Sequence, residues 1–215
     1  VFVPILKPYS ALLSTFFCKA PSPITRFLHH TPPQVLEAAV VALRNELYEL
    51  LARVLSLNIR NLKLDWKTLK LHQEDQHFLE SRFPADASFE ERYRTTKQLE
   101  GAIHQYMGEL QATQLSPEQV LVFSELISCA RDAIYAAKTL KDVRSDLIQF
   151  RHKSGSTNHP ALYYPSALVK IYATFCELLQ HNHRSDYIDT KIAWLKEQNE
   201  SLHQQLHEEI LVYIN

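Results

Sequence analysis

The chain has 215 residues, of which 46% are hydrophobic and 22% are charged, as in an ordinary globular protein with one core or two small ones. Its 23 Lys and Arg are matched by 24 Asp and Glu, so the formal net charge of −1 argues against a strongly basic nucleic-acid surface. With only 3 Gly, the chain has few residues for tight hairpins or a glycine-rich phosphate loop, and the composition favours helices.

The first 32 residues differ from the rest because they are apolar and rich in proline. Val1–Phe17 is strongly apolar but is interrupted by Pro4, Lys7 and Pro8, and no run of about 18 apolar residues is present to span a membrane. The segment lacks the basic start and the cleavage site of a signal peptide. We interpret residues 1–32 as a juxtamembrane segment or linker, which either follows a membrane helix or packs on the domain.

Apolar residues at helical spacing predict an all-α fold of about six helices in the remainder. The expected ranges are about 33–64, 65–82, 88–114, 115–150, 160 or 165 to 180, and 185–215. The wide apolar stripe of the first helix predicts contact with more than one neighbour, and Glu46 and Glu49 are expected on its solvent side. Gly101 and Gly108 should weaken the third helix by roughly 1 kcal/mol each, a cost that close packing against the alanine-rich fourth helix would offset.

Local signals mark where two of these helices begin. Ser88 is followed three residues later by Glu91, and Ser116 is followed by Pro117 and Gln119. A hydroxyl at the cap with an acidic or amide side chain three residues on is the spacing of a capping box, and proline is favoured at the first helical position. The third and fourth helices are therefore expected to begin directly after Ser88 and Ser116.

The longest uninterrupted pattern runs over Leu115–Phe150 and predicts one helix of roughly 33 residues. With IHQYMGELQATQ (Ile103–Gln114) before it, this segment resembles the cytosolic PhoU-like region of bacterial sodium/phosphate cotransporters. The shared pattern is a helix ending in I-x-x-Y, a short L-S turn and a long helix of the type ARDxxxxAKxLKDxR. The resemblance covers roughly residues 33–215 and implies an elongated bundle of two tandem three-helix units, 33–114 and 115–215.

The resemblance also implies a function for the chain. It implies a non-enzymatic regulatory domain of a sodium-dependent phosphate transporter, at the cytoplasmic face of the bacterial inner membrane. The partner would be the membrane portion of the same polypeptide, with a homo-oligomer also possible, and no cofactor, nucleic acid or small-molecule substrate is expected. Two alternatives stay open, namely a metal-binding PhoU-type accessory protein and a helical interaction scaffold unrelated to phosphate.

Acidic and histidine pairs are the candidate metal ligands. The PhoU family carries E/D-x-x-x-D metal motifs, but aligning Arg131-Asp132 with the family's Arg-Asp puts Ile134 and Lys138 at the next acidic positions, so that copy is broken. The candidates that remain are the i, i+4 pairs Asp142 with Asp146 and His203 with His207, and the helix 65–82 cluster. That cluster consists of His72, Glu74, Asp75 and His77. For each set, a solvated helix face is the favoured interpretation.

One helix carries a basic series that could meet an anion or a partner. This series is Arg131, Lys138, Lys141 and Arg144. A solvated face paired with nearby aspartates is the more common arrangement for such residues.

The three cysteines are far apart in the sequence and form no CxxC pair. Cys18, Cys129 and Cys176 are an odd number, and the last two fall within helical apolar patterns. They are therefore interpreted as buried reduced thiols.

Overall fold

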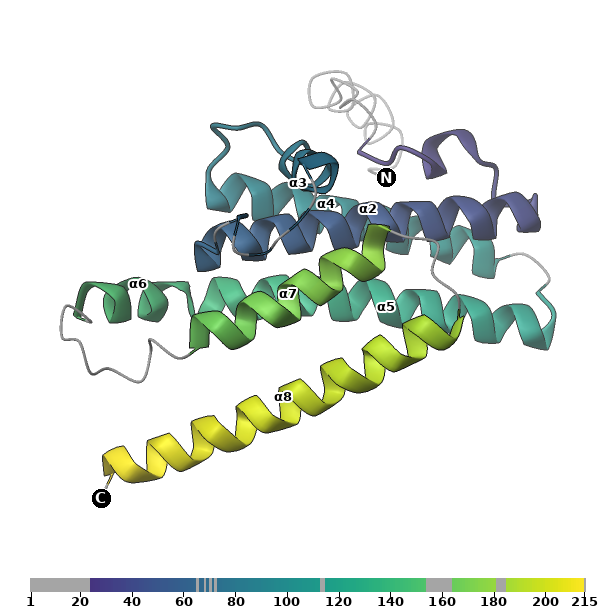
Figure 1. Cartoon of the computed structure of the whole chain (residues 1–215). Coiled ribbons are helices and arrows are strands. Elements are labelled where there is room, and N and C mark those ends of the chain that lie inside the picture. The colour runs from purple at the N-terminus through teal and green to yellow at the C-terminus, as the bar shows by residue number, and fades with distance from the viewer. Residues whose placement is uncertain are drawn as a thin grey trace, which may run out of the picture.

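The computed structural model describes residues 24–64, 66, 67, 69, 71, 73–112, 115–153, 164–180 and 185–214. Within these ranges the chain is all α-helical and contains no strand, which confirms the predicted fold class. The elements are the 3-10 turn η1 (Leu28–His30) and seven helices: α2 (Leu36–Leu62), α3 (Gln73–Glu80), α4 (Phe89–Gln111), α5 (Pro117–Asp142), α6 (Arg144–Lys153), α7 (Tyr164–Gln180) and α8 (Ser185–Ile214) (Figure 1). Most of the expected juxtamembrane segment, residues 1–23 with Cys18, lies outside the described residues.

Helix α2 is the centre of the fold, because α3, α4, α5, α7 and η1 all pack against it. One of its apolar stripes faces α4 and α5 and builds the larger core cluster with buried residues that include Leu43, Leu50 and Leu57. A second stripe of α2, which includes Ala52 and Ile59, packs in the smaller cluster together with residues of α3 and α7. The prediction that this helix contacts more than one neighbour is therefore confirmed.

The three helices α2, α4 and α5 form the main bundle, and each packs along the other two. Helices α2 and α4 belong to the expected first unit, and α5 belongs to the second. The division into units 33–114 and 115–215 stays a prediction. Helix α7 crosses α2, and α8 packs along α7 and runs away from the bundle (Figure 1). In the described part of the chain, no helix is long and apolar enough to cross a membrane.

The expected single helix over Leu115–Phe150 is wrong in one respect. It begins as predicted, with a complete capping box between Ser116 and Gln119, but it is interrupted at Val143, where φ is −91° and ψ is 2°. No Gly or Pro marks this position, and Val is only a slightly poor helix former. The interruption coincides with tertiary contacts of Arg144, the next residue, which reaches Asn61 of α2 and Glu90 of α4. Contacts between distant segments, and not local propensity, accompany the break.

Helix α3 is shorter than the range 65–82 expected for it. It covers Gln73–Glu80, and Leu69 before it and Leu79 within it are buried in the smaller cluster. Phe78 is 37% exposed, and the guanidinium of Arg82 lies 4.1 Å from the centre of its ring. A cation over the ring face covers part of this aromatic surface in place of core contacts.

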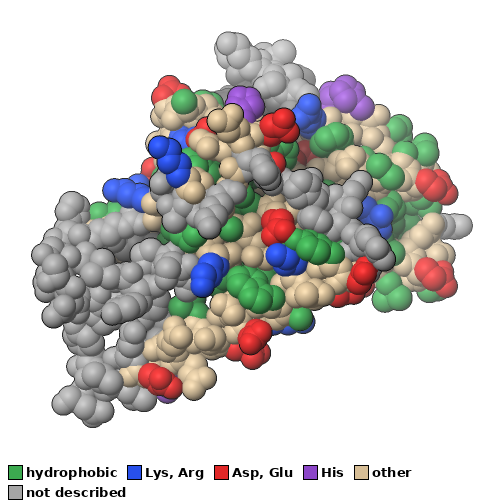
Figure 2. Space-filling view, in the orientation of Figure 1, with side chains coloured by type: hydrophobic (Ala, Val, Ile, Leu, Met, Phe, Trp, Pro, Cys, Tyr) green, Lys and Arg blue, Asp and Glu red, His purple; other side chains and the backbone are tan. Residues whose placement is uncertain are grey.

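The surface facing the viewer in Figure 2 mixes acidic and basic side chains, with no large area of one sign. Hydrophobic side chains gather at the end of the molecule where α2 and α5 begin (Figures 1 and 2). The exposed apolar residues in these two helices include Val41 near the start of α2 and Val120 and Leu121 in the first turns of α5. The mixed charges agree with the net charge of −1.

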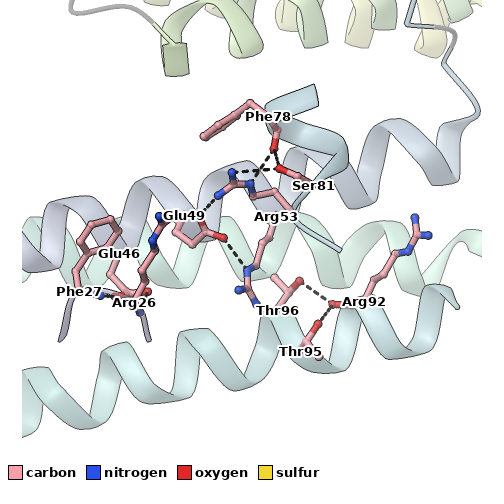
Figure 3. A network of polar contacts seen from close by, with 11 residues as sticks. Arg26, Phe27, Glu46, Glu49, Arg53, Phe78, Ser81, Arg92, Thr95 and Thr96 are labelled. Carbon is pink, nitrogen blue, oxygen red and sulfur yellow. Dashed lines mark hydrogen bonds and ion pairs between the residues drawn. The ribbon is translucent and has the colours of Figure 1, made fainter. Parts of the chain in front are cut away.

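The expectation that Glu46 and Glu49 lie on the solvent side of α2 is wrong. Glu46 is fully buried, and its carboxylate accepts hydrogen bonds from the backbone N–H groups of Arg26, Phe27 and Leu28, at 3.1, 2.8 and 3.2 Å (Figure 3). It thereby fixes the segment before α2 onto the middle of that helix. We call this arrangement the Glu46 clamp.

Glu49 lies one turn further along α2 and is also largely covered. Its two carboxylate oxygens pair with Arg53 on the same helix, at 3.1 Å, and with Arg82 after α3. Only 10% of the Glu49 side chain is exposed, so these pairs are better shielded from solvent than ordinary surface pairs. They tie the end of α3 to α2.

Gly101 and Gly108 do not make the close helix contact expected of them. A Cβ built on either glycine meets no atom within 4 Å, and both positions are exposed on α4. The cost of these glycines in a helix is therefore not offset by packing.

We expect Gly101→Ala and Gly108→Ala each to raise the free energy of unfolding by about 1 kcal/mol. The added methyl group has space, and alanine loses less backbone entropy than glycine on entering a helix. Urea unfolding followed by circular dichroism measures the change. A variant that is less stable than the parent would show that one of these positions is in contact with something.

Candidate functional site

Two of the basic residues predicted on the fourth helix, Lys141 and Arg144, meet α4 near the junction of α5 and α6. An open groove of about 460 Å³ lies there, lined by Glu90, Tyr93, Arg94, Lys97 and Gln98 of α4 and by Lys141 of α5. We call it the α4–α5 groove. Ser88 caps the start of α4 as predicted, because its side chain accepts a hydrogen bond from the backbone N–H of Glu91. The cap fixes where this face of the helix begins.

Two aromatic rings of α4 support the cations of this region. Phe89 and Tyr93 are stacked, with ring centres 6.4 Å apart. The ammonium of Lys141 lies 4.7 Å from the centre of the Tyr93 ring, and the guanidinium of Arg144 lies 4.8 Å from that of Phe89. Cation–π contacts of this kind hold the charged groups in place while leaving their outer side accessible to a ligand.

The charges around the groove are only partly neutralised within the chain. Arg144 pairs with Glu90 at 3.4 Å, and Arg94 lies 3.9 Å from Glu91. Lys97 makes no hydrogen bond or ion pair in the described part of the chain, and Lys141 makes only its contact with the Tyr93 ring. Two ammonium groups that line the same groove without a carboxylate partner can bind an anionic group through charge-assisted hydrogen bonds.

The four predicted basic residues do not form one continuous surface. Lys141 lines the groove, Arg144 lies next to it, and Lys138 is one turn earlier on α5 and pairs with Asp142 at 2.5 Å. The hydrogen bond to Asp142 raises the pKa of Lys138, which stays protonated. Arg131 is about 15 Å before Lys141 along the helix, and its polar partners among the described residues are Ser128 and Asp132. Arg131 therefore belongs to a separate part of the surface.

Sequence analysis missed Arg94 and Lys97, which supply cations from the opposite side of the groove. The available signal was their spacing, because Glu90, Arg94 and Lys97 fall at i, i+4 and i+7 and so share one face of α4. Nothing in the sequence, however, indicated that this face would meet the last turns of α5.

The candidate metal ligands are not brought together into a site. The described residues contain no group of three or more His, Cys, Asp or Glu placed to hold a metal ion. Asp142 and Asp146 were expected on one continuous face, but Asp142 ends α5, Asp146 lies in the first turn of α6, and the break at Val143 separates them. His203 and His207 are exposed on α8.

The cluster predicted on the second helix is described only in part. Glu74 and His77 are exposed on α3, and Asp75 is half-buried beside them. His72 lies outside the described residues. This cluster therefore adds no metal site in the part of the chain that the structure covers.

Two cysteines are described, and both are free thiols. Cys176 on α7 is fully buried in the smaller core cluster, and Cys129 on α5 is half-buried. Burial raises the pKa of the Cys129 thiol, and it raises that of Cys176 from 9.0 to about 12. A thiol is nucleophilic only when ionised, so Cys176 is suited to packing and not to catalysis.

We expect the free energy of unfolding to fall as the pH rises from about 9 towards 12, in part through Cys176. In this range the thiol of the unfolded chain loses its proton while the folded one keeps it, so the unfolded state is favoured. Below this range both states are protonated and the thiol contributes no pH dependence. Urea unfolding at a series of pH values should show a shallower fall for Cys176→Ala, and equal slopes would contradict the assignment.

The fold is an all-α helical bundle, and its α4–α5 groove is lined by basic and aromatic side chains. Comparisons with protein-family models, with curated proteins and with solved structures found no match for the chain. The resemblance to the PhoU-like region of sodium/phosphate cotransporters therefore rests on the motif residues of α4 and α5 alone.

Proposed function

We propose that the chain is a regulatory helical domain of a sodium-dependent phosphate transporter and acts by docking on the membrane portion of that transporter. The observation that carries the proposal is the α4–α5 hairpin. Its residues Ile103–Gln114 and Leu115–Phe150 bear the cotransporter-like pattern. The first of these segments contains the end of α4, and the second contains α5, which begins at the capping box of Ser116, and most of α6. Helices α4 and α5 pack on each other.

The α4–α5 groove is the contact through which this docking would act. Lys97 and Lys141 present positive charge beside the Tyr93 ring and are not neutralised by carboxylates. Acidic side chains on the partner would pair with these ammonium groups and set the orientation of the bundle. A domain that binds two transport states with different affinity shifts the equilibrium between them, which is sufficient for regulation without catalysis.

The first test is the coding sequence upstream of Val1. We expect it to encode roughly eight or more hydrophobic spans of about 20 residues each in the same reading frame. Upstream sequence without such spans would overturn the transporter proposal and favour the scaffold or accessory-protein alternatives.

The second test is transport by the whole polypeptide in vesicles. We expect phosphate uptake driven by a sodium gradient, and we expect Lys141→Glu to change its rate by about fivefold, within the usual range of coupling between sites. Arg131→Glu is the matched control, because it reverses the same charge on the same helix outside the groove and should leave the rate close to that of the parent. Absence of phosphate uptake would overturn the proposed function, and equal rates for the two variants would overturn the role of the groove.

A further inference from the structure

Helix α8 is the longest described helix, with 30 residues, and it is attached to the rest of the fold mainly through one neighbour. Among the described helices, only α7 packs along it to any extent, and the helix extends well beyond the bundle (Figure 1). The contact with α7 uses one edge, where Glu177 of α7 accepts hydrogen bonds from Tyr187 and, at 3.1 Å, from Lys191. Trp194 and Gln198 continue this edge at helical spacing and are half-buried. None of the side chains described on α8 is fully buried.

The adjacent face of α8 carries apolar residues at alternating spacings of four and three. These residues are Ile188, Ile192, Leu195, Leu202 and Leu206, with Asn199 in the same register. The centre of this face lies about 90° around the helix from the edge that contacts α7, given about 100° per residue. The face is therefore centred away from the α7 contact. On it Ile192 is 40% exposed and Asn199 is exposed, whereas Ile188, Leu195 and Leu202 are half-buried. We call it the α8 seam.

The alternating spacing is that of a coiled coil sustained over about three heptads. Ile192, Asn199 and Leu206 occupy the first core position of successive heptads, and Ile188, Leu195 and Leu202 occupy the second. One heptad, with Ile192 at the first position and Leu195 at the second, has the combination of a β-branched residue and leucine that favours two parallel strands. A single asparagine at the first position also favours a parallel dimer, because the two amides face each other and fix the register.

We propose that α8 forms a parallel two-stranded coiled coil with α8 of a second copy of this chain. The flanking charges permit this arrangement. Lys191 and Lys196 would approach each other across a parallel pair, but Lys191 is held by Glu177 of its own chain, which neutralises it. The next flanking pair, Gln198 and His203, brings no like charges together because Gln198 is uncharged. The α7 edge lies to one side of the seam, so each bundle extends away from the two-fold axis.

The mass of the 215-residue chain in solution, measured by sedimentation over a range of concentrations, tests the proposal. We expect a dimer, and we expect Leu202→Glu to weaken association by at least about tenfold, because the charge would face its own copy in the seam. Ser201→Glu is the matched control, because it adds the same charge one residue away on an exposed face and should leave the dimer intact. A monomeric parent chain, or equal effects of the two variants, would overturn the proposal.

A second measurement tests the parallel register independently of stability. In a parallel pair, Asn199→Cys places two thiols opposite each other across the two-fold axis, the arrangement that an intermolecular disulfide needs. We expect oxidation to give a covalent dimer for Asn199→Cys and only the background of the native cysteines for Ser201→Cys. A dimeric chain in which neither variant, or both equally, cross-links would overturn the parallel arrangement. Circular dichroism of each variant confirms that the helices are retained.

Discussion

Replacing Glu46 with alanine is expected to lower the free energy of unfolding by about 3 kcal/mol. The change removes the acceptor for three backbone N–H groups, those of Arg26, Phe27 and Leu28. Each buried donor left unpaired costs about 1–3 kcal/mol, but the first two are only partly buried and can regain water. The N–H of Leu28 lies in a buried contact and carries most of the expected loss. Urea unfolding followed by circular dichroism measures the change.

Two further variants separate the Glu46 clamp from a general effect of losing an acidic residue. Glu46→Gln keeps one acceptor oxygen and should cost less than Glu46→Ala. Glu125→Ala removes an exposed carboxylate from α5 and should stay within about 0.5 kcal/mol of the parent. Hydrogen exchange provides a local measurement, because the amides of Arg26, Phe27 and Leu28 should lose protection in Glu46→Ala. Unchanged protection of these amides would contradict the clamp.

The parts of the fold that depend on neighbouring residues could be predicted from the sequence. The apolar stripes of α2 are set by a spacing of three and four residues, and both were found buried. The starts of α4 and α5 were predictable because the cap residues Ser88 and Ser116 bond to backbone groups only three residues away. Helix periodicity and capping are local, so a single sequence contains them.

The features that were missed depend on residues far apart in the chain. Glu46 meets its donors 18–20 residues before it, so a charged residue in a helix pattern looked solvent-exposed although the fold buries it. The break at Val143 accompanies a contact of Arg144 with Asn61, 83 residues away. Glycine contacts were expected from composition alone, and the actual helix crossing leaves both glycines open.

The candidate site illustrates the same limit. Lys141 and Arg144 were identified from one helix, but a groove needs two, and Arg94 and Lys97 come from α4. Helical spacing shows which residues share a face, whereas the pairing of faces is decided by the packing of the whole bundle. The basic series predicted on one helix therefore contained one residue that lines the groove, Lys141, and also Arg131, which lies outside it.

Replacing Leu99 with alanine is expected to lower the free energy of unfolding by about 3 kcal/mol, within the range of about 2–5 kcal/mol for such core truncations. Leu99 lies in the middle of α4, is fully buried and belongs to the core cluster shared by α2, α4 and α5. Truncation loses the transfer free energy of the removed methyl groups and leaves a cavity that the surrounding helices fill only in part. Urea unfolding followed by circular dichroism measures the loss.

The control for this prediction makes the same chemical change where the side chain is in water. Leu121 on α5 is 66% exposed, so Leu121→Ala should change the free energy of unfolding by no more than about 0.5 kcal/mol. The helix propensities of the residues exchanged are the same in both variants, so the difference between them measures burial alone. Similar losses for the two variants would mean that the exposed start of α5 is covered in solution. Small losses for both would mean that α4 does not pack into the α2–α5 core.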